Sequence, residues 1–333
     1  MKSKTKFNIA DKTVSKIFDA ANLGGVIKIM PLSHGEFNYV LKVTTNIQDF
    51  VLKVAPKSDT PILTLEKNML AQEIAFYNLI HSNTSMGVPK VFYSDFSKVL
   101  IDADYFIMEF MQGEMLNKVR LNDEQKRNVN IRLMEFLSEL HQIKGQGFGY
   151  VQNGLKDNWY DAIKFMIGNL IADYSAIDKQ LPFAITLLEY VEKYSDALKA
   201  VSPSLVNFDL WDLNILYTKT RNGDNDFTLS LIDPERCFYG DYLGDFVAIE
   251  FLKPLDKKLY LFSAYNKNLI NGLSNEEKAR YFIMNGYLTL IMQTEKPYRY
   301  KKSQLKYFIH TLTAKLFESY ALKGLKSLDI KMA

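Results

Sequence analysis

The sequence contains a single cysteine, Cys237, among its 333 residues. One cysteine excludes an intrachain disulfide and any zinc site built from several cysteines, and it suits a reducing cytoplasm. The sequence has no run of about 18 apolar residues that could span a bilayer. The basic residues 1–6 are not followed by the apolar segment of a signal peptide. We therefore expect a cytoplasmic protein that has no membrane partner.

A strong charge of either sign is also missing. The net charge is only +3 and the lysines are scattered along the chain, so we expect no nucleic-acid partner. The apolar fraction of 47% and the charged fraction of 24% are ordinary for a globular protein. A chain of this length can form two lobes, each with a substantial core. The oligomeric state does not follow from these features.

The residue pattern that points most clearly to a chemical function is one polar stretch, residues 207–214. Asp209 and Asn214 are separated by four residues, so one tight loop can present both side chains. A carboxylate in such a loop can orient an attacking hydroxyl and accept its proton. This spacing therefore suggests phosphoryl transfer, provided that a metal-binding carboxylate lies nearby.

A predicted hairpin supplies that carboxylate. Its strands are residues 215–217 and 229–232, and Asn222-Gly223 is a dipeptide typical of hairpin turns. Because a hairpin folds back on itself, it returns Asp233 to the side of Asn214. An amide and a carboxylate then face one small volume, as a Mg²⁺ site on nucleotide phosphates requires.

These segments resemble those of the aminoglycoside phosphotransferase and choline kinase family, whose members are small-molecule kinases with a protein-kinase-like fold. The family usually has His-Gly-Asp, four residues and Asn, followed later by Ile-Asp-Trp-Glu. The matching residues are Asp209, Asn214 and Asp233, and the departures are Asn207, Phe208 and Pro234. Residues 240–245 resemble the family's Gly-Asp-Pro-x-x-Asp element, which implies that Asp245 braces the catalytic loop. Asn207 can still donate and accept hydrogen bonds in place of the family's histidine.

The N-terminal part has the pattern of a kinase nucleotide-binding lobe. Three strands are predicted at residues 26–30, 39–43 and 50–54, and the loop between the first two contains Ser33 and Gly35. In this arrangement the backbone of the loop reaches the phosphates, and a lysine on the third strand pairs with them. Lys53 has that position. A lysine flanked by apolar residues needs a partner if it is buried.

A helix starting at Thr60 or Thr64 and running to about His81 supplies that partner. By the resemblance Glu73 pairs with Lys53, and Glu66 is the competing candidate. Two further strands are predicted at residues 88–93 and 105–108. The second runs into a polar break that resembles the hinge between lobes. The resemblance implies that the Glu109 carbonyl and the Met111 N–H meet the adenine edge.

We therefore predict an α+β, protein-kinase-like bilobal fold. Residues 1–110 form the nucleotide-binding N-lobe, with an antiparallel sheet and one main helix. Residues 111–333 form the mostly helical C-lobe, which carries catalysis and acceptor binding. The predicted C-lobe helices begin after Asn122, which with Gln125 suits a capping box. The others cover residues 159–174, 187–198, 256–270, 275–295 and 303–323.

The resemblance implies ATP- and Mg²⁺-dependent transfer of phosphate to a hydroxyl of a small molecule, with GTP as an alternative donor. Asp209 is the catalytic residue, Asn214 and Asp233 are metal ligands, and Trp211, Asp212 and Glu235 are acceptor candidates. The acceptor itself could be aminoglycoside-, ketosamine-, choline- or sugar-like. A polycation would need acidic walls, for which the candidates are Asp157, Asp161, Asp212, Glu235 and Glu250. Asn207 leaves a second hypothesis open, a catalytically degenerate binding protein with a kinase fold.

Overall fold

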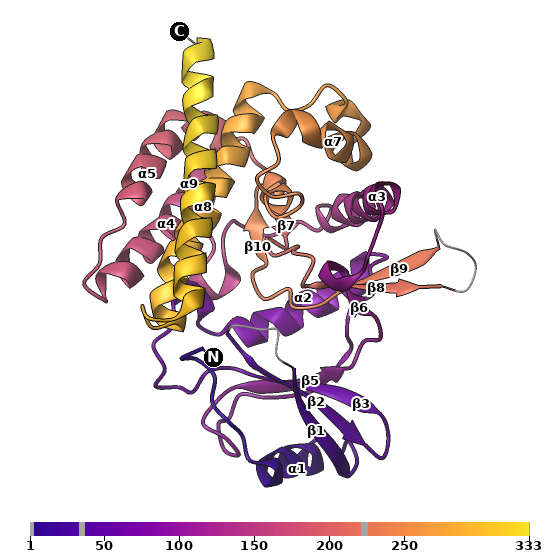
Figure 1. The fold of residues 1–333 in the computed structure, drawn as a ribbon. Helices are drawn as coiled ribbons and strands as arrows, with labels where there is room; N and C mark the ends of the chain where they lie inside the picture. Colours follow the sequence, from indigo (N-terminus) through magenta and orange to yellow (C-terminus); the bar gives the residue numbers. More distant parts are fainter. Residues whose placement is uncertain (1–2, 33–36, 221–225, 333) are drawn as a thin grey trace.

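The computed structural model describes residues 3–32, 37–220 and 226–332. Its N-terminal part is a five-stranded antiparallel sheet with the strand order β1-β2-β3-β5-β4 (Figure 1). The strands are β1 (Val26–Leu32), β2 (Tyr39–Thr45), β3 (Asp49–Val54), β4 (Val91–Asp95) and β5 (Tyr105–Glu109). The antiparallel sheet of the predicted fold is therefore confirmed.

The alternating side chains of β3 separate the two faces of this sheet. Phe50, Leu52 and Val54 pack with the helix α1 (Asp11–Ala20), while Val51 belongs to the core on the opposite face. Successive residues of a strand point to opposite faces, so Lys53 shares the face of Val51. This face is turned toward the rest of the molecule.

The helix α2 (Met69–Asn83) lies between the sheet and the C-terminal part (Figure 1). It starts later than predicted, because Thr64–Glu66 forms a separate 3₁₀ turn and Asn68 adopts a left-handed conformation with φ 57°. Left-handed backbone cannot continue a right-handed helix. The buried side of α2 contains Leu70, Glu73 and Tyr77.

The C-terminal part is mostly helical, as predicted. Its helices are α3 (Asp123–Leu140), α4 (Trp159–Ser175), α5 (Pro182–Lys193), α6 (Ser195–Lys199), α7 (Leu259–Tyr265), α8 (Asn275–Arg299) and α9 (Leu305–Met332). The long helices α8 and α9 pack side by side (Figure 1). The predicted capping box of α3 is present, since Asn122 and Gln125 exchange side chain–backbone hydrogen bonds.

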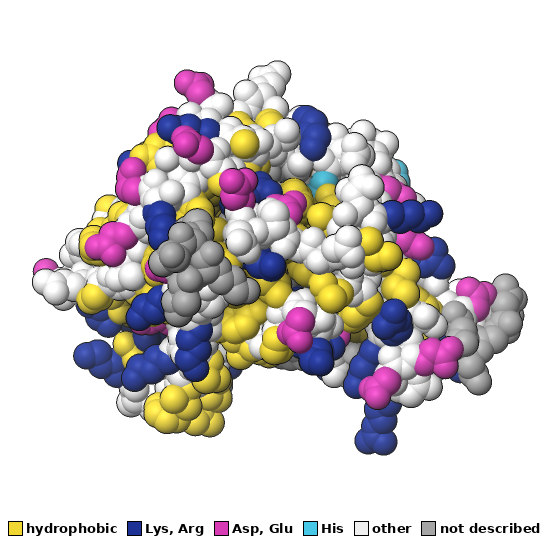
Figure 2. Space-filling view, turned by 90° about the horizontal axis from the view of Figure 1, so that it is seen from above, with side chains coloured by type: hydrophobic (Ala, Val, Ile, Leu, Met, Phe, Trp, Pro, Cys, Tyr) yellow, Lys and Arg dark blue, Asp and Glu magenta, His cyan; other side chains and the backbone are white. Residues whose placement is uncertain are grey.

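Several predicted helix boundaries were wrong. The helix expected at 187–198 is divided into α5 and α6 at Tyr194, whose ψ of 25° departs from helical backbone. The segment expected to be one helix at 256–270 contains only the short α7, flanked by 3₁₀ turns. In contrast, α9 continues to Met332. Within the described ranges, no helix combines the length and apolar character needed to cross a membrane. On the face shown in Figure 2, basic and acidic side chains are interspersed.

Short strands connect the helices near the centre of the molecule. The predicted hairpin is confirmed by β8 (Ile215–Lys219) and β9 (Phe227–Leu231), which β6 (Glu114–Met115) extends to three strands. Its turn at Asn222-Gly223 lies outside the described residues. The strands β7 (Ser204–Val206) and β10 (Phe238–Gly240) form a second small sheet. β7 leads directly into the polar stretch 207–214.

Candidate active site

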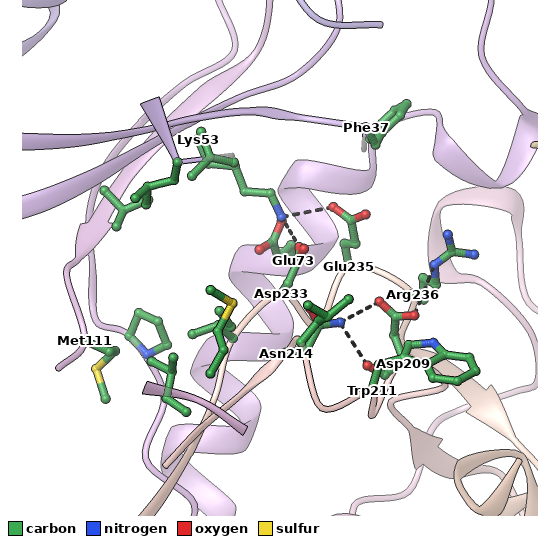
Figure 3. A pocket seen from close by; sticks show the side chains of 18 of the residues that line it. Phe37, Lys53, Glu73, Met111, Asp209, Trp211, Asn214, Asp233, Glu235 and Arg236 are labelled. Carbon is green, nitrogen blue, oxygen red and sulfur yellow. Dashed lines mark hydrogen bonds and ion pairs between the residues drawn. The ribbon is translucent and has the colours of Figure 1, made fainter. Parts of the chain in front are cut away.

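Lys53 projects from β3 into a group of three carboxylates. Its Nζ lies 2.7 Å from Glu73 and 2.9 Å from Glu235, and it also forms a short ion pair with Asp233 (Figure 3). Burial by itself lowers the pKa of Lys53, but the three carboxylates outweigh this effect and raise it well above the ordinary value. The ammonium group is therefore charged and fixed in position.

The structure distinguishes between the two candidate partners of Lys53, Glu73 and Glu66. Glu73 on α2 reaches Lys53, whereas Glu66 forms an ion pair with Arg299 and accepts a hydrogen bond from the Leu63 N–H at 2.8 Å. Burial raises the pKa of Glu73 to about 7, and the neighbouring Asp233 charge adds to this while Lys53 opposes it. The geometry thus agrees with the pairing that the sequence suggested for Glu73.

Asp209 and Asn214 face each other across the tight loop. The Asn214 Nδ2 donates to the Asp209 carboxylate at 2.8 Å and to the Asp209 carbonyl at 2.9 Å. Burial raises the pKa of Asp209 to about 6, while the positive charge of Arg236 opposes the rise. Because its amide nitrogen is occupied in this way, Asn214 keeps its amide oxygen for another partner.

The loop is held by Asp245, a buried carboxylate that follows β10. It accepts hydrogen bonds from the backbone N–H groups of Asn207 at 3.0 Å and Phe208 at 2.6 Å. The His141 Nε2 lies 2.9 Å from the same carboxylate, and its Nδ1 lies 2.9 Å from the Tyr265 hydroxyl. Asp245 therefore connects the end of α3 to the loop that carries Asp209.

Asn207 supports the loop from inside. Its Oδ1 accepts a hydrogen bond from the Asp209 N–H at 3.0 Å, and its Nδ2 lies 3.8 Å from the buried Cys237 Sγ. The asparagine therefore makes a local hydrogen bond of the kind that shapes tight turns. It is fully buried, so the hydrogen bond to the loop is shielded from competing water.

The hairpin brings Asp233 beside Asn214, as the sequence predicted. The Ile232 N–H donates to the Asn214 carbonyl at 2.9 Å, and the Asp233 N–H donates to the Tyr77 hydroxyl at 2.8 Å. Asp233 has φ 62°, a left-handed conformation that asparagine and aspartate tolerate better than most residues. Tyr77 fixes this residue through a contact that the sequence pattern did not reveal.

The charges around Asp233 fit a divalent cation. Oxygen atoms of Glu73, Asp233 and Glu235 lie within 4.8 Å of one another, with one ammonium group among them. Three carboxylates around one lysine leave an excess of negative charge when all are ionised. Mg²⁺ prefers carboxylate and amide oxygens, and Asp233 and Asn214 offer one of each. These residues can therefore hold a Mg²⁺ ion.

These groups line one cavity of about 760 Å³. In Figure 3, Met111 lies at one end, Trp211 and Arg236 lie at the other, and Lys53 and Asn214 lie between them. Glu109, at the end of β5, also lines the cavity near Met111. Ser33 and Gly35, predicted to reach the phosphates, lie outside the described residues.

The three acceptor candidates have different surroundings. Trp211 lines the cavity, but Asp212 is exposed and does not. Glu235 lines the cavity beside Lys53, and it accepts a hydrogen bond from the Asn38 Nδ2 at 2.6 Å. The burial of Glu235 and its contact with Lys53 place it with Glu73 and Asp233.

Sequence reasoning missed an arginine at the end of the cavity near Trp211 (Figure 3). Arg236 lies 3.5 Å from Asp209 through its Nε, and its Nη2 pairs with Glu295 of α8. Arg236 follows Glu235 in the sequence and is close to Asp233, so its position could have suggested a role in the site. Its partner Glu295 is 59 residues away, however, and no local pattern joins the two.

This geometry and the fold define the class of protein. A family model described as the phosphotransferase enzyme family matches residues 28–249. The match covers more than half of the chain, so the protein belongs to this family. No curated protein matches the sequence significantly.

Solved structures with the same fold include aminoglycoside phosphotransferases. One from Ralstonia eutropha JMP134, assigned to that activity, is 13% identical with a TM-score of 0.65, over 96% of this chain and 99% of the other. A protein assigned as a fructosamine-3-kinase from Haemophilus somnus 129PT is 17% identical with a TM-score of 0.61, over 93% and 97% of the two chains. The ternary complex of APH(2″)-IIa with streptomycin and ATP is 18% identical with a TM-score of 0.56, over 94% and 99%. The predicted protein-kinase-like fold is confirmed.

Proposed function

We propose that this protein transfers the γ-phosphoryl group of ATP to a hydroxyl of a small molecule. The main observation in support of the proposal is the order in which polar side chains follow one another along one cavity. Lys53 pairs with Asp233, Asp233 lies beside Asn214, and Asp209 lies beyond them toward Trp211 (Figure 3). A phosphate-binding cation, metal-binding oxygens and a hydroxyl-orienting carboxylate are the parts that phosphoryl transfer needs.

The nucleotide would occupy the end of the cavity near Met111. The Glu109 carbonyl and the Met111 N–H are the proposed contacts for the base, and Ser33 and Gly35 belong to the loop proposed to cover the phosphates. Support for a purine nucleotide comes from the structural neighbours, which include complexes with ATP and GDP. Residues 1–110 would then form the nucleotide-binding lobe and residues 111–333 the catalytic lobe.

Asn214 and Asp233 are the proposed ligands of Mg²⁺. When bound, the ion would neutralise part of the negative charge of the phosphates. Lys53 would pair with the phosphates, and Glu73 would keep its ammonium group directed toward them. Most of the rate enhancement would come from this positioning and charge stabilisation.

Asp209 would orient the acceptor hydroxyl and accept its proton. The hydroxyl oxygen forms the new bond to the γ-phosphorus while the bond to the β–γ bridging oxygen breaks, and ADP leaves. Asn214 keeps the Asp209 carboxylate in place through the 2.8 Å hydrogen bond. Asp245 and Asn207 support the backbone around Asp209 through the hydrogen bonds to the loop.

The competing hypothesis, a degenerate binding protein, was raised by Asn207 in place of the family's histidine. The hydrogen bond from the Asp209 N–H to Asn207 supports an intact loop. Asp209, Asn214, Asp233 and Lys53 are all retained as well. We therefore favour the enzyme.

The test is acceptor-dependent release of ADP from ATP and Mg²⁺. Aminoglycosides, ketosamines, choline and sugars are compared, with Asp209→Asn as the catalytic variant. We expect at least one acceptor to stimulate ADP release in the wild type but not in Asp209→Asn. Nucleotide binding without transfer to any acceptor class would favour the degenerate binding protein.

A further inference from the structure

The end of the cavity near Trp211 is the proposed acceptor end, and the five carboxylates expected to bind a polycationic acceptor do not line it. Of these five carboxylates, only Glu235 is among the described residues that line the cavity. Glu235 is buried and bound to Lys53 and Asn38, so it does not face the acceptor end. The carboxylates that do lie at this end, Asp209 and Glu295, already pair with arginine.

Two arginines lie at the acceptor end instead. Arg236 and Arg299 both line the cavity, and both guanidinium groups contact the same oxygen, Glu295 Oε1. Arg299 lies 4.0 Å from this oxygen and also pairs with the buried Glu66. Because they share one carboxylate oxygen, the two positive groups are neighbours. Arg236 also lies beside Asp209, where the acceptor hydroxyl must be bound.

Arg299 has an unused hydrogen-bond donor. Its side chain is 4% exposed, and the Nη1 group has no hydrogen-bond partner within the described structure. A buried donor without a partner is energetically unfavourable. Since Arg299 lines the cavity, a bound molecule can supply the missing acceptor atom. An anionic oxygen is the strongest partner for a guanidinium group.

Apolar side chains also line the cavity, together with the polar Glu295 and His310. Leu288 and Met292 of α8 line the cavity together with Trp211 and Leu213. These side chains can contact the carbon skeleton of a ligand but cannot bind several amino groups. The acceptor end thus combines an apolar surface with a pair of neighbouring arginines.

We propose that the acceptor is a hydroxylated small molecule that carries an anionic group, a carboxylate or a phosphate, bound by Arg299 and Arg236. This inference rests on the proposed kinase function and specifies its acceptor class. The anionic group would contact the free donor of Arg299. The hydroxyl would lie between Arg236 and Asp209, and polycationic aminoglycosides would be rejected by the two arginines.

The experiment is calorimetric titration of the protein saturated with MgADP, which occupies the nucleotide site so that anions cannot compete there. Matched ligands differ only in the anionic group: glycerate and glycerol 3-phosphate against glycerol, and gluconate against sorbitol. We expect at least one anionic ligand to bind at least tenfold more tightly than its neutral partner. The carboxylate and phosphate arms distinguish the two anions. Kanamycin serves as the polycation.

The key variant is the double substitution Glu66→Gln/Arg299→Met, because removing Arg299 alone leaves Glu66 buried without its partner. We expect it to reduce the preference for the anion to about twofold or less, while MgADP still binds. Arg299→Lys, which keeps the charge, should retain part of the preference. Arg132→Met is the matched control, since it removes an arginine that is 61% exposed in its side chain and does not line the cavity.

Three results with the wild type would overturn the proposal: neutral ligands that bind as tightly as the anions, kanamycin that binds more tightly than both, or no binding of any anion at millimolar concentration. An anion preference that survives the double substitution would also contradict it, because Arg299 would then have no part in recognition. Failure of MgADP to bind is a different result, which would refute the kinase function itself.

Discussion

Phe208 shows how a large side chain can occupy a position that the family usually gives to glycine. Its backbone is left-handed, with φ 60°, and its side chain is fully buried. The ring contacts those of Phe238 and Tyr287, with centroids 5.2 and 5.7 Å away. A left-handed conformation costs a non-glycine residue about 1–2 kcal/mol. Burial of the ring offsets this, because removing a buried Phe typically destabilises a protein by about 3–5 kcal/mol.

This balance predicts an unusual order of stability for two truncations. Phe208→Ala loses the ring and keeps the strain, so we expect it to lower the free energy of unfolding by about 3–5 kcal/mol. Phe208→Gly loses the ring but relieves the strain, while the greater freedom of glycine in the unfolded chain costs about 0.5–1 kcal/mol. The glycine variant should therefore be more stable than the alanine variant by roughly 0.5–1 kcal/mol.

Urea unfolding followed by circular dichroism measures the difference, with the denaturant slopes compared to check that the variants unfold alike. Phe238 is the matched control, because it is also fully buried but has no positive φ. There Phe238→Gly should be less stable than Phe238→Ala. If glycine is also the less stable substitution at position 208, the strain argument is wrong.

Three further predictions concern other parts of the molecule. Glu73→Gln removes a charged partner of Lys53 and should weaken MgATP binding roughly tenfold, measured by calorimetry, since such hydrogen bonds contribute about 1.5–3 kcal/mol. Burial lowers the pKa of Lys258 from 10.5 to about 7. Between these pH values the unfolded chain binds more protons, so this residue makes stability rise with pH. Lys258→Met should remove that rise. Urea unfolding at pH 7 and pH 10 measures this, because the free energy of unfolding of the wild type relative to Lys258→Met should increase with pH. Asn122→Ala should lose about 1 kcal/mol of stability in the same assay, because its side chain accepts from the Gln125 N–H at the start of α3; no loss would exclude a role for the cap.

The parts of the fold that were predictable from sequence rest on local patterns. The apolar residues around Lys53 mark a buried strand, and the capping box at Asn122 and Gln125 marks the start of α3. The spacing of Asp209 and Asn214 within one loop also required no knowledge of distant residues. In each case the interacting groups are close in the chain, so the sequence contains the whole pattern.

The missed features depend on residues that are distant in the chain. Arg299 pairs with Glu66 over 233 positions, and this contact explains why Glu66 is buried without touching Lys53. Arg236 and Glu295 meet only because α8 packs against the site. The break at Tyr194 also escaped prediction, because the apolar spacing continues across it. Tertiary packing decided these features, and helical periodicity carries little information about it.

The account's central claim is that Asp233 and Asn214 form a metal-dependent nucleotide site, and calorimetric titration of the protein with ATP tests it most directly. The titration is made with and without Mg²⁺ on the wild type, Asp233→Ala and Asp209→Asn. We expect binding that requires Mg²⁺, weakens at least tenfold in Asp233→Ala, and persists in Asp209→Asn. No binding of ATP or GTP, or ATP binding that is indifferent to both Mg²⁺ and Asp233→Ala, would contradict the claim.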